Sequence, residues 1–142
     1  MPSRSLSDET YVIDLCDEVL GMLAQRQHGF DFLRGDARPG TQGMRLPVDA
    51  YYLDKQLAVE YCERQHTEAV PIMDRRMTVS GVVRGTQRAI YDQRRRDVLP
   101  KHGIELVELS YADFAHDKNK HLCRLRPEDL AVVRQALAKW IR

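Results

Sequence analysis

The sequence has few of the features that mark secreted, membrane or zinc-knuckle proteins. Its three cysteines, Cys16, Cys62 and Cys123, are odd in number and lie far apart. They form no Cys-x-x-Cys pair, so the spacing indicates neither a disulfide framework nor a zinc knuckle. No apolar run approaches transmembrane length, and residues 1–10 lack the apolar segment of a signal peptide. We therefore expect a cytoplasmic protein with no membrane span.

An excess of charge of one sign is also missing. The 22 lysines and arginines are balanced by 21 aspartates and glutamates, and the net charge of +1 argues neither for nor against a polyanionic partner. Hydrophobic residues make up 43% of the chain and charged residues 30%, which is typical of a globular protein. A chain of 142 residues can form one core without cross-links, so we expect a single domain over residues 1–142.

Apolar spacing in the first half of the chain predicts one helix followed by three strands. Ser7 is a candidate N-cap for residues 8–27, where apolar side chains recur every three or four residues, as in an amphipathic helix. Alternating or continuous apolar residues predict strands over 30–34, 45–53 and 56–63. The short connections between them predict an antiparallel meander.

The second half of the chain adds a helix, a strand and a last helix. Residues 66–85 have no clear periodicity and predict a long surface loop. Residues 84–103 predict a helix, and residues 104–111 predict a strand. Residues 112–126 are expected to form a loop before a final helix over 126–142, which has proline in its first turn. The expected fold class is mixed α/β, with the order α-β-β-β-α-β-α.

Two carboxylates fall inside neighbouring predicted strands. Asp49 lies in the second strand, and Glu60 lies in the third, on the same face as Cys62. If the strands pair across their short turn, the two acids can meet and form an oxygen-rich site for Mg²⁺ or Mn²⁺. The alternative is that both acids point to solvent. Glu18, on the first helix, could join the same metal or lie on a solvated helix face.

Positive charge is concentrated in one segment of the chain. Residues 75–96 hold seven arginines and a single acid, Asp92. Because the planar guanidinium group suits phosphate, this segment is a candidate nucleic-acid surface. The alternative is a solvated helix face with an internal ion pair between Asp92 and Arg95 or Arg96. The candidate nucleic-acid contacts are Arg75, Arg76, Arg84, Arg88, Arg94 and Arg95.

Two separated segments, LPVDAYYLDKQLAVEYCERQH (residues 46–66) and YDQRRRDVLPKHGIELVELSY (residues 91–111), carry a shared family pattern. They resemble the PD-(D/E)xK nuclease superfamily, and within it the branch related to the very-short-patch repair endonucleases. The first segment is similar to the strand–turn–strand that carries the motif acids, and the second to the helix and strand that follow. The resemblance covers residues 8–111. It implies a restriction-endonuclease-like α-β-β-β-α-β core with a mixed sheet flanked by helices.

The resemblance implies a divalent-metal-dependent nuclease that hydrolyses phosphodiester bonds in duplex or single-stranded DNA. One copy would nick one strand, whereas a homodimer could cut both. Asp49, Glu60 and the carbonyl of Tyr61 would bind Mg²⁺ or Mn²⁺. The implied catalytic residues are Asp49, Glu60, His66 for proton transfer, Glu18 as an auxiliary acid and Gln87 as an auxiliary polar group.

Cys62 departs from the family pattern, because the superfamily usually has lysine at this position. A lysine would orient the attacking water and neutralise charge in the transition state, which cysteine does poorly. Arg64 or Arg88 could supply the missing charge, or His66 could carry the proton chemistry with the metal alone. The sequence also leaves open a catalytically impaired nucleic-acid-binding or regulatory module, and a protein-interaction domain.

Overall fold

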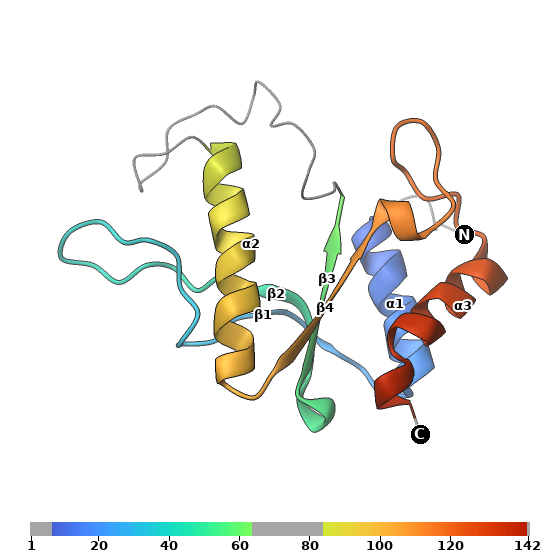
Figure 1. The fold of residues 1–142 in the computed structure, drawn as a ribbon, viewed down its shortest axis with the longest axis horizontal. Coiled ribbons are helices and arrows are strands. Elements are labelled where there is room, and N and C mark those ends of the chain that lie inside the picture. Colours follow the sequence, from blue (N-terminus) through green and yellow to red (C-terminus); the bar gives the residue numbers. More distant parts are fainter. Residues whose placement is uncertain (1–6, 64–83, 142) are drawn as a thin grey trace.

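A four-stranded sheet with helices on both faces forms the centre of the protein. The structure, a computed structural model, describes residues 7–63 and 84–141. Within these residues the elements follow the order α1-β1-β2-β3-α2-β4-α3 (Figure 1), which confirms the predicted mixed α/β class. The helices are α1 (Asp8–Leu20), α2 (Arg84–Lys101) and α3 (Arg126–Ala136), and the strands are β1 (Gln25–His28), β2 (Val48–Tyr52), β3 (Leu57–Cys62) and β4 (Glu105–Ser110).

The sheet is mixed because its fourth strand arrives by a crossover. The spatial order is β1-β2-β3-β4, and β1, β2 and β3 form an antiparallel meander as predicted, although its first strand covers Gln25–His28 and not residues 30–34. β4 pairs with β3 in parallel, from Leu57 opposite Glu105 to Cys62 opposite Ser110. A parallel pair cannot be joined by a tight turn, and α2 lies in the connection between these two strands.

The two faces of the sheet are covered by different helices. α1 and α3 pack together on one face, and α2 lies on the other (Figure 1). Leu57, Val59 and Tyr61 of β3 belong to the core beneath α1 and α3. Ala58 belongs to the second core, with Leu99 of α2. The predicted alternation of β3 is therefore confirmed, and it directs the remaining side chains of this strand towards α2.

The first helix is shorter than predicted, and the prediction of helix up to residue 27 is wrong. Gly21 has a left-handed φ of 69°, and its N–H bonds to the carbonyl of Asp17, which ends α1 after Leu20. The carboxylate of Asp17 then accepts from the N–H of Ala24 (3.0 Å) and the hydroxyl of Tyr52 (2.6 Å). These bonds turn the chain into β1, where the sequence pattern predicted more helix.

The predicted first strand over 30–34 is also wrong. The N–H of Leu33 bonds to the carbonyl of Phe30 (3.2 Å), so the chain turns there. The alternating aromatic residues stack on each other instead of alternating across a sheet, with the rings of Phe30 and Phe32 4.9 Å apart. The strand-like pairing of Arg34 is limited to an isolated bridge to Arg45.

The other predicted boundaries differ by less. The final helix ends at Ala136 and is followed by a short 3₁₀ turn, Ala138–Trp140. The expected loop over 112–126 contains one isolated bridge, between His116 and Leu122. The predicted loop over 66–85 lies outside the described residues, except for its last two positions, which begin α2. None of the helices in the described segments is long and apolar enough to cross a membrane.

Candidate functional site

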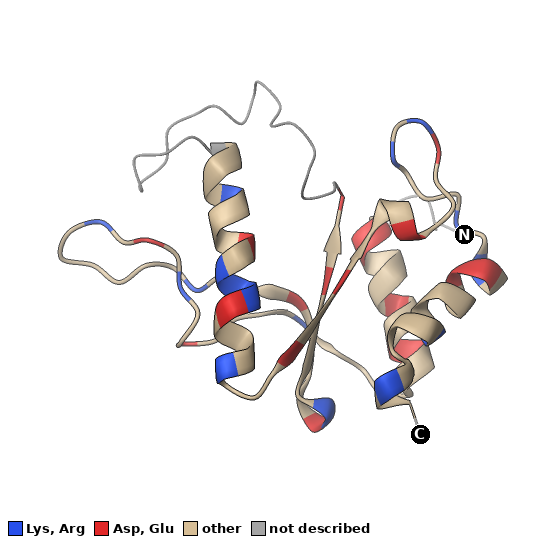
Figure 2. Cartoon of the chain, in the orientation of Figure 1, with Lys and Arg blue, Asp and Glu red and all other residues tan. Residues whose placement is uncertain are grey.

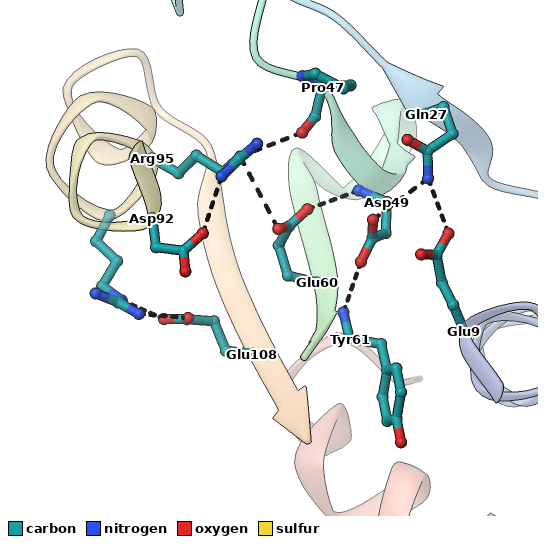
Figure 3. Close-up of polar contacts among 10 residues, drawn as sticks. Glu9, Gln27, Pro47, Asp49, Glu60, Tyr61, Asp92, Arg95 and Glu108 are labelled. Atoms are coloured by element: carbon teal, nitrogen blue, oxygen red, sulfur yellow. Dashed lines mark hydrogen bonds and ion pairs between the residues drawn. The ribbon is translucent and has the colours of Figure 1, made fainter. Parts of the chain in front are cut away.

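The structure brings Asp49 and Glu60 together where β2 and β3 separate. Ala50 pairs with Val59, so Asp49 lies opposite Glu60 one step further along the strands. The N–H of Asp49 donates to Oε2 of Glu60 (2.7 Å), and the N–H of Tyr61 donates to Oδ2 of Asp49 (2.8 Å; Figure 3). The two carboxylates thus accept from backbone groups at this end of the strand pair, which holds both side chains in place.

Each of these carboxylates has a second oxygen with weaker contacts. Oδ1 of Asp49 lies 3.3 Å from the amide nitrogen of Gln27. Oε1 of Glu60 lies 3.9 Å from Nε of Arg95. Backbone N–H groups therefore fix the orientation of the two carboxylates, and the second pair of oxygens makes contacts long enough to be exchanged for a ligand.

Burial and mutual repulsion disfavour two negative charges at this position. Burial raises the pKa of Asp49. Burial, and secondarily the charge of Asp49, raise the pKa of Glu60 to about 8, although Arg95 acts in the opposite direction. At neutral pH the metal-free pair therefore holds a proton on Glu60. A bound cation would stabilise the doubly ionised form and release that proton.

We expect Glu60→Gln to remove a loss of stability at alkaline pH. The pKa of Glu60 in the folded protein, about 8, lies above its ordinary value of 4.5. Its contribution to stability is therefore complete below pH 4.5 and is lost as the pH rises through 8, by about 1.4 kcal/mol for each pH unit between the two values. Urea unfolding of wild type and variant at pH 5 and pH 9 measures this. The two proteins should diverge at pH 9, whereas Glu63→Gln, at an exposed neighbouring acid, should follow wild type; parallel curves for Glu60→Gln would contradict the assignment.

Arg95 supplies the positive charge beside Glu60. Its Nε lies 3.2 Å from the carbonyl of Pro47, and its Nη1 lies 3.0 Å from the carboxylate of Asp92 (Figure 3). The side chain is 15% exposed, so the guanidinium group is held between α2 and the start of β2. The sequence had suggested Arg64 or Arg88 for this role. Arg64 lies outside the described residues, and the structure places Arg95 here instead.

The thiol of Cys62 cannot supply the positive charge that a lysine would carry at this position. Burial raises its pKa to about 12, and the nearby carboxylates of Asp92 and Glu108 add to this effect. The side chain is therefore a neutral thiol at physiological pH. It carries no positive charge to stabilise a phosphate, and it is not a thiolate nucleophile.

Glu9, and not Glu18, is the acid of α1 that lies near the pair, so the prediction for Glu18 is corrected. Glu18 forms an ion pair with Arg126 of α3. Glu18 lies nine positions after Glu9 on the helix, which is about 13.5 Å along its axis. Oε2 of Glu9 accepts from the amide of Gln27 (2.8 Å), and burial, followed by the charge of Asp49, raises the pKa of Glu9.

Four of the six predicted phosphate-binding arginines are described in full or in part, and the side chains of Arg94 and Arg95 make internal contacts that attach α2 to the sheet and its loops. Arg94 donates to the carbonyl of Arg34 (2.9 Å) and to Asp36 (3.0 Å). The internal pair between Arg95 and Asp92, which the sequence offered as an alternative, is present. Acidic and basic positions are interspersed along α2 in Figure 2. A phosphate group would therefore compete with existing partners for these side chains.

The remaining predicted residues are placed as follows. His66, Arg75 and Arg76 lie outside the described residues, and only the backbone of Arg84 is described. Arg88 is partly buried on α2, one turn before Asp92. Gln87 lies on the α2 stripe of Tyr91 and Arg94, which contact residues 35–36, and not on the stripe of Asp92 and Arg95.

Side chains alone do not form a complete metal site in the segments that the structure describes. There, no group of three or more histidine, cysteine, aspartate or glutamate side chains is arranged to hold a metal ion. A cation at Asp49 and Glu60 would need further oxygen ligands from the backbone or from water. Mg²⁺ meets this condition, because it is usually bound by one or two carboxylates and keeps several waters.

Comparisons of the chain with protein-family models, with curated proteins and with solved structures give no match. The chemistry of the site is therefore argued from its own residues. These are two partly buried carboxylates on adjacent strands, a third acid on α1 and a fixed guanidinium group on α2.

Proposed function

We propose that the protein is a divalent-metal-dependent nuclease of the restriction-endonuclease-like fold that hydrolyses phosphodiester bonds in DNA. The observation that carries the proposal is the backbone-fixed pair of Asp49 and Glu60, which disfavours its own doubly ionised state. The resemblance of residues 46–66 and 91–111 to the PD-(D/E)xK superfamily supports the same reading. We expect the enzyme to act in the cytoplasm.

The residues fit a hard divalent cation. Asp49 and Glu60 would bind Mg²⁺ or Mn²⁺ through the oxygens that now make long contacts, and the carbonyl of Tyr61 would be a backbone ligand beside them. When bound, such an ion supplies an activated water and stabilises charge on the phosphate. The N–H groups of Asp49 and Tyr61 keep both carboxylates oriented.

Arg95 takes the charge-stabilising role that lysine has elsewhere in the superfamily. Asp92 and Pro47 hold its guanidinium group beside Glu60, so the positive charge is already in place when a phosphate approaches. The planar donor group can bind two phosphate oxygens. His66, which lies outside the described residues, stays a proposed proton-transfer group.

The neutral thiol of Cys62 favours a second candidate function. In this alternative, the protein keeps the same fold but is catalytically impaired, and it binds nucleic acid or acts as a regulatory module. A module of this kind would bind DNA in a salt-dependent way without cleaving it. A protein-interaction domain would neither bind DNA nor cleave it. The internal contacts of Arg94 and Arg95 leave less free positive charge for either form of binding than the sequence suggested.

The test is cleavage of supercoiled plasmid, single-stranded DNA and RNA by the full chain with Mg²⁺ or Mn²⁺, together with calorimetry of Mn²⁺ binding. We expect Mn²⁺ binding and conversion of plasmid to nicked or linear DNA, both abolished by a chelator. First-order nicking would indicate action as a monomer, and direct linearisation would indicate a homodimer. Salt-dependent DNA binding without cleavage would replace the nuclease by the binding module, and the absence of metal, DNA and RNA binding would reject both.

A further inference from the structure

Gln27 has an unusual backbone for a residue inside a strand. Its φ of 49° lies in the left-handed region, which glycine and asparagine adopt far more readily than glutamine. Both neighbours are nevertheless paired with β2, Arg26 with Ala50 and His28 with Val48. The distortion is therefore confined to the one residue that lies opposite Asp49.

The side chain of Gln27 links three elements at the candidate site. Its amide nitrogen donates to Oε2 of Glu9 on α1 at 2.8 Å and lies 3.3 Å from Oδ1 of Asp49 on β2 (Figure 3). A primary amide has two N–H groups, so one side chain can serve both carboxylates. A neutral donor placed between two acids reduces their repulsion without adding a charge.

Gln56 offers an internal comparison, because it is also a glutamine and has a φ of 48°. It is exposed and ends the short 3₁₀ turn Leu53–Lys55, with its N–H bonded to the carbonyl of Leu53. Its backbone also accepts from the N–H of Glu105. Turn geometry accounts for the left-handed residue at Gln56. At Gln27 there is no such turn, and the conformation instead places the amide beside two carboxylates.

We infer that Gln27 is a positioning residue of the proposed metal centre, whose amide holds the Asp49 carboxylate and keeps Glu9 beside it. The inference rests on the proposed function, because the oxygen that Gln27 contacts is the one assigned to the cation. Strained backbone conformations persist where the surrounding structure requires them, and they are frequent at functional sites. Here the left-handed backbone of Gln27 directs its side-chain amide towards the carboxylates of Glu9 and Asp49.

The test compares Gln27→Gly with Gln56→Gly. Both substitutions relieve a left-handed residue, so both proteins should keep or raise their melting temperature, by up to about 4 °C. Gln27→Gly alone should weaken Mn²⁺ binding in calorimetry by about tenfold or more, the usual cost of removing a group that orients a metal ligand. It should also shift the amide proton of Tyr61 in metal-free NMR spectra, since that N–H reports on the Asp49 carboxylate. Gln56→Gly should change neither.

A second substitution separates positioning from folding. Gln27→Met keeps the length of the side chain and a non-glycine residue at the left-handed position, but it removes the amide. The variant should therefore bind Mn²⁺ more weakly, while its melting temperature should stay near that of wild type. This variant decides the question if Gln27→Gly unfolds. Wild-type Mn²⁺ affinity and an unmoved Tyr61 amide in Gln27→Met would overturn the inference and leave the nuclease proposal standing. Failure of wild type itself to bind Mn²⁺ would overturn both.

Discussion

Asp49→Asn should reduce metal-dependent DNA cleavage by about 100-fold or more, equivalent to at least ~2.7 kcal/mol in the activation barrier. Asparagine keeps the shape of the side chain, and its amide oxygen can still accept from the N–H of Tyr61. The substitution removes the negative charge that a divalent cation needs. It also removes the repulsion that helps to raise the pKa of Glu60, so that pKa should fall towards its ordinary value. The folded protein should be at least as stable as wild type near neutral pH.

Plasmid cleavage under single-turnover conditions and Mn²⁺ calorimetry measure this effect. The matched control is Asp54→Asn, which changes an exposed aspartate in the turn between the same two strands. The control should cleave and bind Mn²⁺ like wild type. Equal cleavage by Asp49→Asn and wild type would mean that the carboxylates of Asp49 and Glu60 are not the metal ligands.

Arg95→Met should lower the cleavage rate by about tenfold or more, and adding Cys62→Lys should restore part of the loss. Arg95 carries the charge beside Glu60, whereas Cys62 carries none. A lysine at position 62 would place an ammonium group near the acids Asp92 and Glu108, which already influence this thiol. Arg95→Met also leaves the carbonyl of Pro47 without its donor, so we expect a loss of stability of about 1–3 kcal/mol.

Four proteins form a double-mutant cycle: wild type, the two single variants and the combination. Rates are measured at saturating Mn²⁺ and at a temperature where all four are folded, as checked by circular dichroism. A coupling between the two sites indicates that both side chains act on the same charge. If Arg95→Met cleaves at the wild-type rate and Cys62→Lys changes nothing, Arg95 only fastens α2 to the sheet. In that case the catalytic cation must come from elsewhere.

The parts of the fold that the sequence predicts well are those where one physical signal dominates. The strict alternation in β3 assigns Leu57, Val59 and Tyr61 to one face, and burial confirms it. The same alternation places Glu60 on the face towards α2, where Arg95 lies. The two apolar strands are joined by a short turn, which makes them pair so that Asp49 lies opposite Glu60. The position of this pair could therefore be predicted from the length of the turn and the spacing of the two acids.

The parts that the sequence does not predict depend on contacts between distant residues. Apolar spacing continues past Gly21, but the left-handed Gly21 ends the helix, and the Asp17 carboxylate then accepts hydrogen bonds from Ala24 and Tyr52. Because the sequence predicts helix up to residue 27, it does not predict β1 or the contact of Gln27 in that strand with Glu9. A run of arginines shows charge but not its partners. The sequence therefore predicts a general phosphate-binding role for Arg95 and does not predict its position beside Glu60.

The candidate site draws on α1, β1, β2, β3 and α2, from Glu9 to Arg95. No short stretch of the chain contains more than a fraction of it. A chain still emerging from the ribosome, or one clipped by a protease, would lack at least one of these groups at its proper place. For the proposed nuclease, this arrangement would prevent DNA cleavage by each molecule until its synthesis and folding are complete.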